Sequence, residues 1–534
     1  MTTRLNITSI GRDTQLLIDD YIVDDIWMIR RSPEMPVKHL NNPIFASDSP
    51  FEDILGQSVM YDEDDKMFKM WYTLHDRDKR WLPKGHTYMY RGAYAVSEDG
   101  LLWDKPKLGI VEHKGTKDNN LFLEDGTGFI IKDKIDRNPG RHYKMLVKRS
   151  CSNNGRVFAS FSNDGIHWND YPSGESVLTH SRDGGNPVVF DSQIGKYVLF
   201  CRPTILAAEK TLEPGDIGFP DHRIFRQAGS KSSDYLEGSP GEIGFPSQDD
   251  FVLNWEAEDY IHRYLKVFPY TDTRALRIFK GQYGCNRRIA RSVSDDFIHW
   301  SEPDVVIRPD ELDPPKFYNL NVTLYKGLYI GLLEVFYAWG NRRFPGCPQE
   351  SEVFDLQLTF SRDGIRWERL ANRPVFIPRG CIGAFDGGMV ESLQQPIIEY
   401  GNELRIYYNG YQFCHNVPGG VMGIGVARLP KERLVARCAG DEMGVLMTKP
   451  FIVEGDRLEI NVDARKGLLK VEIAEADGQP IEGFGVEDAI EIKNNGFIIP
   501  VEWRGGSKPA ELKGRLVRLR FYMYQARLYS FRFS

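Results

Sequence analysis

The side chains of this chain that could do chemistry are acidic residues at the ends of short apolar and β-branched runs. A protonated carboxyl group can give a proton to a leaving oxygen, while an ionised carboxylate nearby acts as a base or a nucleophile. Glu334 and Glu391 lie inside such runs and are held as reserve candidates. The principal candidates for this acid–base chemistry are Asp53, Asp183, Glu350, Glu352 and Asp386.

Basic, polar and aromatic side chains are expected beside these acids. Guanidinium groups bind carboxylates or phosphates in a bidentate manner, and aromatic rings offer flat apolar surfaces. The candidates for ligand binding are His75, Arg149, Arg202, Arg288, Tyr318, Asn319, Tyr337, Asp355 and His415. Trp81 and Trp339 add two further rings. The arginines favour an anionic ligand, unless they pair with the acids and only hold the fold together, and the rings could equally pack between sheets.

Four copies of one short phrase indicate which elements position these residues. The phrase begins with Ser and ends with Trp, and it occupies residues 97–103, 162–168, 294–300 and 361–367. The copies are about 66 residues apart, with one interval doubled, which is typical of repeat architectures. An apolar run precedes each copy, so each is expected to form the corner of a hairpin, here named a Ser-to-Trp corner.

Each repeat contains two further apolar runs, so it is expected to form four antiparallel strands, as in a propeller blade. Five such repeats cover residues 50–115, 116–180, 181–312, 313–378 and 384–430. Residues 204–284 are broken by Pro and Gly, and we interpret them as an insertion in the third repeat rather than a sixth blade. The last repeat has no Ser-to-Trp corner, so the run Gln15–Val23 is expected to close it.

The repeat stops near residue 440, and the remaining residues alternate between apolar and polar side chains around Asp-Gly and Asn-Gly turns. Such alternation predicts a β-sandwich. The sequence therefore predicts an all-β protein. It has a five-bladed β-propeller over residues 1–438, followed by a C-terminal β-sandwich over residues 439–534.

The topology of a blade indicates where the candidate acids gather. In an antiparallel blade the first strand begins, the second ends and the third begins on one face, while the Ser-to-Trp corners lie on the opposite face. The candidate acids belong to the first of these faces. The aspartates of the corners are therefore expected to be structural and to accept backbone N–H groups of their own turns.

Composition restricts the partners. The 534 residues carry a formal net charge of −7, which gives no reason to expect a nucleic acid. No apolar run approaches the length of about 18 residues that a membrane span needs. The seven cysteines include no C-x-x-C pair, and no histidines stand at ligand spacing, so neither a metal nor a cofactor is expected. The N-terminus lacks the profile of a secretory signal, which predicts a cytoplasmic protein.

With this architecture the chain resembles the glycoside hydrolase superfamily of five-bladed β-propellers, which includes β-fructosidases, arabinanases, xylosidases and mannoside phosphorylases. The segments Leu17–Ile22, Phe317–Asn319 and Phe385–Met389 resemble those of bacterial relatives. The W-M-N-D-P-N-G nucleophile motif, the F-R-D-P motif and the Glu-Cys pair do not occur in the sequence. The resemblance therefore does not imply a fructosidase.

The resemblance implies a carbohydrate substrate and a role for each principal acid. Asp53 matches the base or nucleophile, and Asp183 matches a carboxylate that orients and tunes the others. The proton donor is then Glu350, Glu352 or Asp386. The implied activity is hydrolysis of a glycosidic bond in a substrate that could be furanosidic or anionic. Phosphorolysis with inorganic phosphate and glycan binding without catalysis are the alternatives, and a homo-oligomer is compatible with the sequence.

Overall fold

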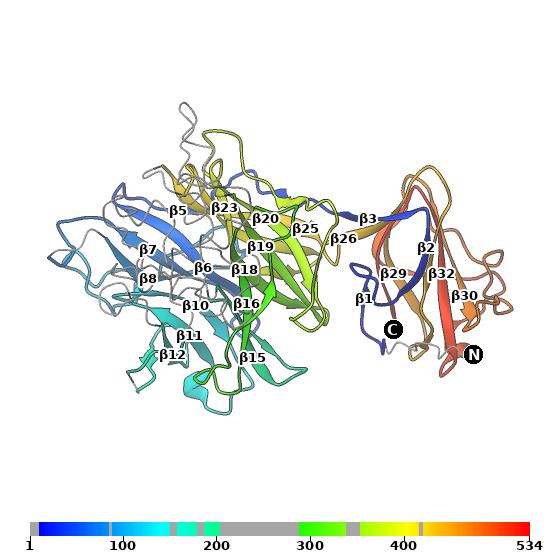
Figure 1. Ribbon diagram of the computed structural model, residues 1–534, viewed down its shortest axis with the longest axis horizontal. Helices are drawn as coiled ribbons and strands as arrows, with labels where there is room; N and C mark the ends of the chain where they lie inside the picture. The colour runs from blue at the N-terminus through cyan, green and yellow to red at the C-terminus, as the bar shows by residue number, and fades with distance from the viewer. Residues whose placement is uncertain are drawn as a thin grey trace, which may run out of the picture. The chain divides into compact units, whose positions relative to one another are not determined.

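The computed structural model describes residues 10–84, 88–149, 157–172, 174–178, 186–202, 288–314, 316–337, 353–415 and 420–534, and it is all-β (Figure 1). In these residues there is no α-helix, and the only helical turns are the 3-10 segments Pro139–Arg141 and Pro509–Leu512. No helix in the described ranges has the length and apolar character needed to cross a membrane. Two compact units divide the chain. The larger comprises Lys38–Ile398 and Arg405–Ala427, and the smaller comprises Met1–Val37, Glu399–Leu404 and Arg428–Ser534.

The larger unit is built from meanders of four or five strands, in agreement with the repeats of the sequence. The first contains β6 (Glu52–Asp62), β7 (Met67–Asp76), β8 (Met89–Ser97) and β9 (Leu121–Leu123). The second contains β10 (Thr127–Lys132), β11 (Tyr143–Lys148), β12 (Val157–Ser162) and β13 (Asn169–Asp170). The third contains β14 (Val188–Asp191), β15 (Lys196–Cys201), β16 (Ile289–Ser294) and β17 (Asp304–Ile307).

Two further meanders complete this unit. The fourth contains β18 (Lys316–Tyr325), β19 (Leu328–Tyr337), β20 (Val353–Ser361), β21 (Trp367–Arg369) and β22 (Val375–Ile377). The fifth contains β23 (Met389–Tyr400), β24 (Glu403–Tyr411) and β25 (Met422–Pro430). The short strands β4 (Val37–Lys38) and β5 (Phe45–Ala46) both pair with β25 and supply the outer edge of the fifth meander.

The pairing in the third meander shows where the long segment between its second and third strands leaves the sheet and returns to it. β15 pairs directly with β16, with Cys201 opposite Ala290. The chain therefore leaves and re-enters the same sheet at adjacent strands, which agrees with an insertion inside the third repeat. Residues 204–284 themselves lie outside the described residues.

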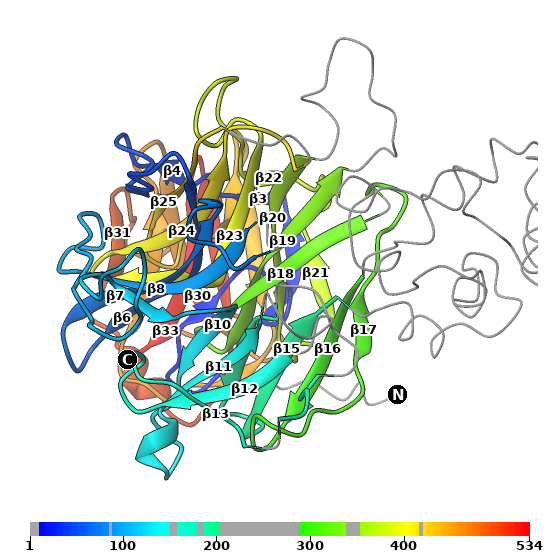
Figure 2. The ribbon, with the colours of Figure 1, turned by 90° about the vertical axis from the view of Figure 1, so that its left-hand side faces the viewer.

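Contacts link the first strands of the five meanders, β6, β10, β14, β18 and β23, in a closed cycle, and four of them, β6, β10, β18 and β23, are labelled in Figure 2. The Ile130 N–H of β10 donates to Ser58 Oγ of β6 at 2.8 Å. β14 lies against both β10 and β18. Asn321 of β18 donates to the Ser392 carbonyl of β23 at 2.8 Å. Gln394 of β23 pairs in parallel with Ser58, which returns the cycle to β6. We call this cycle the inner ring.

The Ser-to-Trp corners have the structure that the sequence predicts. At the second corner, Asp164 Oδ1 accepts the backbone N–H groups of Ile166 and His167 at 2.8 Å, and Ser162 Oγ accepts the Gly165 N–H at 2.9 Å. Gly165 has a φ of +79°, which a glycine adopts without strain. Its carbonyl accepts bonds from Trp168 Nε1 of the same corner and from Trp71 Nε1 of the neighbouring sheet. The corner therefore joins two meanders as well as two strands.

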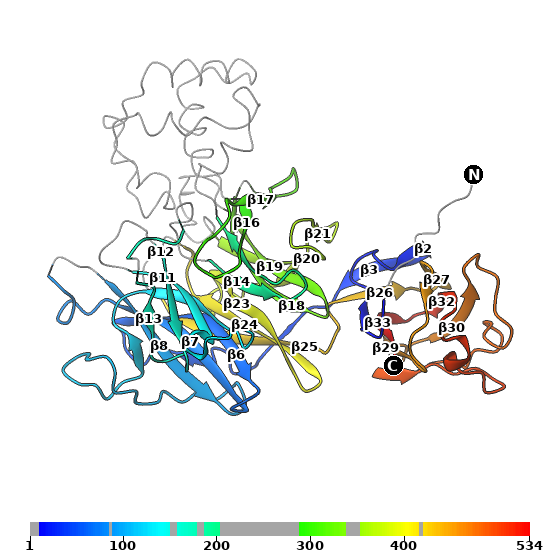
Figure 3. The same ribbon diagram turned by 90° about the horizontal axis from the view of Figure 1, so that it is seen from below.

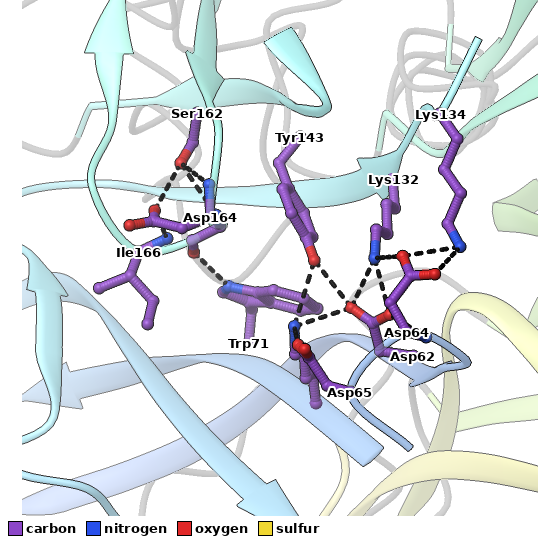
Figure 4. A network of polar contacts seen from close by, with 12 residues as sticks. Asp62, Asp64, Asp65, Trp71, Lys132, Lys134, Tyr143, Ser162, Asp164 and Ile166 are labelled. Atoms are coloured by element: carbon purple, nitrogen blue, oxygen red, sulfur yellow. Dashed lines mark hydrogen bonds and ion pairs between the residues drawn. The ribbon is translucent and has the colours of Figure 1, made fainter. Parts of the chain in front are cut away.

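A buried ionic group joins the first and second meanders at the ends of their strands (Figure 4). The Asp62 carboxylate, at the end of β6, is within 2.7 Å of Lys69 Nζ and of Lys132 Nζ. Tyr143 of β11 donates its hydroxyl to the same carboxylate at 2.9 Å. Hydrogen bonds from the two lysines and the tyrosine outweigh burial and lower the pKa of Asp62, so the carboxylate stays ionised.

The bond from tyrosine to aspartate recurs at the next two boundaries. Tyr197 of β15 donates to Asp133, which follows β10, and Tyr329 of β19 donates to Asp191 at the end of β14. In each case an acid at the end of a first strand meets the start of a second strand of the next meander. We call these contacts the Tyr–Asp latches.

The smaller unit contains two sheets around one apolar core (Figures 1 and 3). One sheet contains β1 (Gln15–Leu16), β3 (Ile29–Pro33), β26 (Val435–Ala439), β29 (Leu458–Asp463), β31 (Asn495–Pro500) and β33 (Arg527–Phe533). The other contains β2 (Val23–Trp27), β27 (Gly444–Thr448), β28 (Phe451–Ile452), β30 (Leu468–Glu475) and β32 (Leu516–Tyr524). Leu446, Leu469, Phe521 and Phe531 from both sheets are buried in this core, which accounts for the alternation in the sequence.

The prediction that Gln15–Val23 closes the last meander is wrong. β1 pairs with β33, and β2 pairs with β27, both in the smaller unit. Leu17 and Ile22 enter the core of that unit, because only there do they find apolar neighbours on all sides. The predicted boundary between residues 438 and 439 also differs, since the smaller unit begins at Arg428 in its C-terminal part and takes in residues up to Val37. Closure by an N-terminal strand is instead made by β4 and β5.

Candidate functional site

The candidate site lies where the strands of the inner ring begin, at the end opposite the Ser-to-Trp corners. β6 and β23 are parallel neighbours in this ring, with Ser58 opposite Gln394. Their N-terminal residues Asp53 and Glu391 therefore lie at the same end. Glu334 of β19 pairs in register with Asn319, near the beginning of β18, which brings it to that end as well.

Glu334 is a carboxyl group enclosed by protein, with 2% of its surface exposed. Its Oε1 accepts bonds from the Ser392 N–H at 3.0 Å, Ser392 Oγ at 3.3 Å and Asn321 Nδ2 at 3.2 Å. Burial and the negative charge of Glu391 raise the pKa of Glu334 well above its ordinary value, although the Ser392 bonds and the charge of Arg202 oppose them. Two carboxyl groups that interact in this way, one of them buried, titrate as a pair and retain one proton more readily than isolated glutamates do.

Glu391 is the more accessible member of this carboxyl pair. It is half-buried, and Tyr411 of β24 donates its hydroxyl to Glu391 Oε2 at 2.5 Å. Burial and the charge of Glu391 raise the pKa of Tyr411 well above its ordinary value, so the phenol stays protonated and remains a donor. Glu391 is therefore the more exposed carboxyl group of the pair.

A β-bulge places an aromatic ring beside the carboxyl pair. The register between β18 and β19 shifts at Tyr318, which leaves this residue as the extra one of the bulge. The guanidinium carbon of Arg202 lies 4.3 Å from the centre of the Tyr318 ring, and the Tyr318 hydroxyl lies 3.5 Å from His415 Nε2. Arg202 also acts electrostatically on Glu334. Tyr318, Arg202 and His415 therefore form one group next to the pair.

Asp53 stands at the start of β6 with a neutral histidine and an arginine. Arg77 NH2 lies 3.0 Å from Asp53, and His75 Nδ1 lies 3.7 Å from it. Burial raises the pKa of Asp53, and the positive charge of Arg77 opposes this shift. Burial, with the charge of Arg77, lowers the pKa of His75 to about 4, so the imidazole is uncharged at neutral pH. The rings of Tyr88 and Tyr90 lie 5.1 Å and 4.9 Å from that of His75.

Glu52, one residue before Asp53 in the chain, is held by cations. It forms an ion pair with Lys114 and lies 3.8 Å from His113 Nε2. The nearby imidazole of His113, followed by the hydrogen bond with Lys114, lowers the pKa of Glu52 despite partial burial. His113 also lies 3.8 Å from Asp76, which contacts Arg91 at 3.4 Å. Glu52 therefore stays ionised and is committed to this cluster.

Asp386, a predicted proton donor, is buried in an ion pair. Lys38 Nζ lies 2.5 Å from Asp386 Oδ2, and the Tyr408 hydroxyl donates to the same oxygen at 2.9 Å. Both contacts of Asp386 are therefore made within the protein.

Several predicted binding residues are occupied by contacts within the protein. Arg149 bonds to the Asp170 carboxylate at 2.5 Å and to the Asp125 carbonyl at 2.7 Å, and Asp355 pairs with Arg379 at 3.1 Å. This is the alternative in which basic residues hold the fold together. The other predicted residues at this end of the strands are Asn319, which is buried in β18, Tyr337, which ends β19, and Arg288, which directly precedes β16.

Three predicted catalytic residues, Asp183, Glu350 and Glu352, lie outside the described residues, as does Trp339. Sequence reasoning did not single out Asn321, Ser392 or Tyr411, because nothing in a strand pattern indicates which side chains face the next sheet. A signal for Glu334 was present. It is the one acid in the apolar run Leu332–Phe336, and a carboxyl group in such a run must be buried with partners.

No group of three or more His, Cys, Asp or Glu side chains in the described ranges is arranged to hold a metal ion. The acids gathered at the inner ring are instead bonded to amide, hydroxyl and cationic partners of the protein. What this arrangement offers chemically is a carboxyl pair in which the pKa of Glu334 is raised, with a separate carboxyl group, Asp53, on a neighbouring strand.

Comparison with known proteins gives relatives in structure alone. No protein-family profile and no curated protein matches the sequence. Among solved structures, the chain is similar to a glycosyl hydrolase from Bacteroides ovatus, with 11% identity over 79% of this chain and 98% of the other, and a TM-score of 0.43. It is similar to an N-acetylgalactosamine deacetylase from F. plautii in complex with blood group B trisaccharide, with 13% identity over 76% and 97% of the two chains and a TM-score of 0.37.

A third similar structure belongs to work on the GH130 family of mannoside phosphorylases, which contains glycoside hydrolases that target β-1,2 mannosidic linkages in Candida mannan. Its identity is 10% over 74% of this chain and 93% of the other, with a TM-score of 0.42. The similar structures thus include glycoside hydrolases, the class that the sequence resembles. At this degree of likeness, the chemistry of the chain has to be inferred from its own residues.

Proposed function

We propose that this chain is a glycoside hydrolase that cleaves glycosidic bonds by carboxyl acid–base catalysis at the start of the inner ring. The observation that carries the proposal is the buried pair Glu334 and Glu391, with Asp53 at the same end of a parallel neighbouring strand. Glycosidic cleavage needs one carboxyl group that keeps its proton near neutral pH and a second, ionised carboxylate. The pair suits the first requirement and Asp53 the second.

The scaffold that we infer for this site is a five-bladed β-propeller joined to a β-sandwich. The closed cycle of five first strands supports the propeller, and the two sheets that share one core in the smaller unit support the sandwich. In a propeller, the starts of the first strands surround one opening. Carboxyl groups from different blades can then approach a single sugar from different sides.

In the proposed reaction, the proton that the carboxyl pair holds on Glu334 moves to Glu391 and from there to the glycosidic oxygen, as the bond from that oxygen to the anomeric carbon breaks. Asp53 then acts on the opposite side of the same carbon. It either accepts a proton from a water molecule that attacks the carbon, or attacks the carbon itself and forms an ester that water later hydrolyses. Both routes end with a hemiacetal and an alcohol, and exchange with solvent restores the starting protonation.

Arg202 favours a second candidate, phosphorolysis. Its guanidinium group is buried beside the carboxyl pair and rests on the Tyr318 ring. A buried guanidinium group is suited to an anionic oxygen of a phosphate or of a uronate. In phosphorolysis, inorganic phosphate replaces water as the nucleophile and the product is a sugar phosphate. Glycan binding without turnover is the third outcome that an experiment must distinguish.

The test is a panel of aryl furanosides and pyranosides, neutral and uronate, assayed with and without inorganic phosphate. Once a substrate is found, Glu391→Gln and Asp53→Asn should each lower kcat/KM by about 100-fold or more, because each removes an acid or base while keeping its shape. Glu63→Gln, an exposed acid at the opposite end of the β6–β7 hairpin, is the control and should leave the rate unchanged.

Full turnover by both active-site variants would refute the catalytic assignment. A rate that depends on phosphate would select phosphorolysis over hydrolysis. Binding of a glycan in calorimetry, without turnover of any member of the panel, would select the binding protein.

A further inference from the structure

A buried clamp made of Asn321, Glu334 and Ser392 fixes the geometry of the carboxyl pair. Asn321 Nδ2 donates to the Ser392 carbonyl at 2.8 Å and lies 2.9 Å from Ser392 Oγ. The Ser392 N–H in turn donates to Glu334 Oε1 at 3.0 Å. All three residues are buried, with no more than 3% of their surface exposed. Ser392 directly follows Glu391, so the clamp fixes the backbone that carries Glu391 and the side chain of Glu334 together.

The donors of the clamp converge on one oxygen of Glu334. The Ser392 N–H, Ser392 Oγ and Asn321 Nδ2 all lie within 3.3 Å of Oε1. An oxygen that accepts from an N–H group and an amide NH2 group cannot also carry the acid proton toward them. A proton on Glu334 therefore sits on Oε2. On Glu391, Tyr411 in the same way donates to Oε2, which leaves Oε1 of Glu391 as an acceptor.

We propose that Asn321 and Ser392 are positioning residues that hold the proton of the carboxyl pair on Oε2 of Glu334. The use of this proton rests on the proposed function, whereas its location is a property of the resting protein. Three titratable or charged groups act on the pair or on its partners. Arg202, after β15, acts on Glu334, Tyr411 of β24 bonds to Glu391, and Tyr318 of β18 acts on Tyr411.

The clamp also sets how readily the pair loses its proton. Donors to a carboxylate stabilise its ionised form, so their removal raises the pKa of the pair. Ser392→Ala removes the Oγ donor and leaves the backbone N–H in place. The loss of one hydrogen bond to a charged group corresponds to a shift of about 1 pH unit. Ser392→Thr keeps a hydroxyl group and should restore the wild-type value.

The experiment measures the carbonyl stretch of the protonated glutamate by infrared difference spectroscopy during a pH titration of the full-length protein. The band is assigned by its loss in Glu334→Gln. We expect it in the wild-type protein at neutral pH, and we expect its titration midpoint to move up by about 1 unit in Ser392→Ala. The matched control is Ser58→Ala. Ser58 is a buried serine of the inner ring whose Oγ accepts the backbone N–H of Ile130 from the next sheet.

Two results would overturn the proposal. One is that the wild-type protein shows no carbonyl band that disappears in Glu334→Gln. This comparison needs only the wild-type protein and one variant. The other is an equal shift in Ser392→Ala and Ser58→Ala, which would mean that loosened packing moves the midpoint. When a substrate is known, the alkaline limb of the rate profile should move with the band. A band that behaves as expected without turnover of any glycoside would refute the proposed function and leave the placement of the proton standing.

Discussion

Glu334 and Asp386 show that a buried carboxyl group takes its chemistry from its immediate partners. Asp386 meets an ammonium group, and its charge is neutralised by that partner. Glu334 meets another carboxyl group, with an arginine nearby, and two such acids cannot both ionise cheaply in a buried place. The first arrangement joins two parts of the fold, while the second raises the pKa of Glu334, which is the property that the proposed acid catalysis requires.

The pH dependence of stability should reveal the stored proton. The pKa of Glu334 is raised in the folded protein, so its contribution is fully present below its unfolded pKa of about 4.3 and is lost as pH rises through the folded value. Over this window the loss amounts to about 1.4 kcal/mol per pH unit. Glu334→Gln lacks the titration, so its stability relative to wild type should improve from pH 5 to pH 8 in urea unfolding. A constant difference across that range would show that Glu334 is ionised in the folded protein.

The inner ring explains why the sequence predicts this end of the strands and Asp53, but not the pairing of Glu334 with Glu391. The alternation of runs and turns predicts where each strand begins, and Asp53 and Tyr318 follow from that order. The pairing of Glu334 with Ser392 depends on how the fourth sheet meets the fifth, and no spacing along the chain encodes that register. Glu334 and Glu391 were therefore visible only as reserve candidates.

At the scale of the elements, the Ser-to-Trp corners are expected to stabilise the fold without touching the chemistry. Asp164→Ala removes the acceptor of two backbone N–H groups, each worth about 1 kcal/mol or less in a half-exposed turn. Unfolding by urea should therefore show a loss of about 1 kcal/mol, with kcat per folded molecule unchanged. A loss of turnover with an unchanged melting temperature would contradict the placement of the site at the opposite end of the strands.

The ionic group around Asp62 should contribute more to the free energy of unfolding than a Ser-to-Trp corner does. Asp62→Asn leaves Lys69 and Lys132 facing a neutral amide in a buried place, which is expected to cost about 3 kcal/mol. Because the pKa of Asp62 is lowered in the folded protein, its contribution is present above the unfolded pKa of about 3.9 and is lost as pH falls below it. The variant should therefore lose less stability than the wild type on acidification from pH 5.

Asp64→Asn is the matched control for this prediction. Asp64 pairs with the same Lys132 but is exposed, so the substitution should change the free energy of unfolding by less than about 1 kcal/mol. Equal changes in the free energy of unfolding for the two substitutions would mean that burial does not increase the contribution of Asp62 to stability. The Tyr–Asp latches themselves have no counterpart in the sequence pattern, because each joins residues from different repeats.

For the whole molecule, the sequence predicts the repeats but not the partners of the chain's beginning. An apolar N-terminal run and an incomplete last repeat suggested a closing strand, which is a sound inference when only one sheet edge is known to be open. The smaller unit offers two further sheet edges and an apolar core, and β1 and β2 pair there. Alternation predicts that a segment becomes a strand, while the choice among open edges depends on side-chain fit in three dimensions.

The composition of the smaller unit from both ends of the chain determines how a truncated protein should behave. Removal of residues 440–534 takes away β33 and β27, which pair with β1 and β2, and β32, which pairs with β27. It also removes the other residues of the apolar core around Leu17 and Ile22 that these strands supply. The remaining N-terminal strands then expose apolar side chains and unpaired edges. We expect this truncation to aggregate, as measured by size-exclusion chromatography with light scattering.

A second variant separates loss of the core from loss of the whole unit. Deletion of residues 1–36 together with 440–534 also removes the apolar side chains that the first truncation leaves without partners, while β4 and β5 remain available to β25. This double truncation should aggregate less than the single one, because fewer orphaned strands remain. Equal solubility of the single truncation and the full chain would show that β1 and β2 find other partners. It would contradict the expectation that these strands need residues 440–534 to bury their apolar side chains.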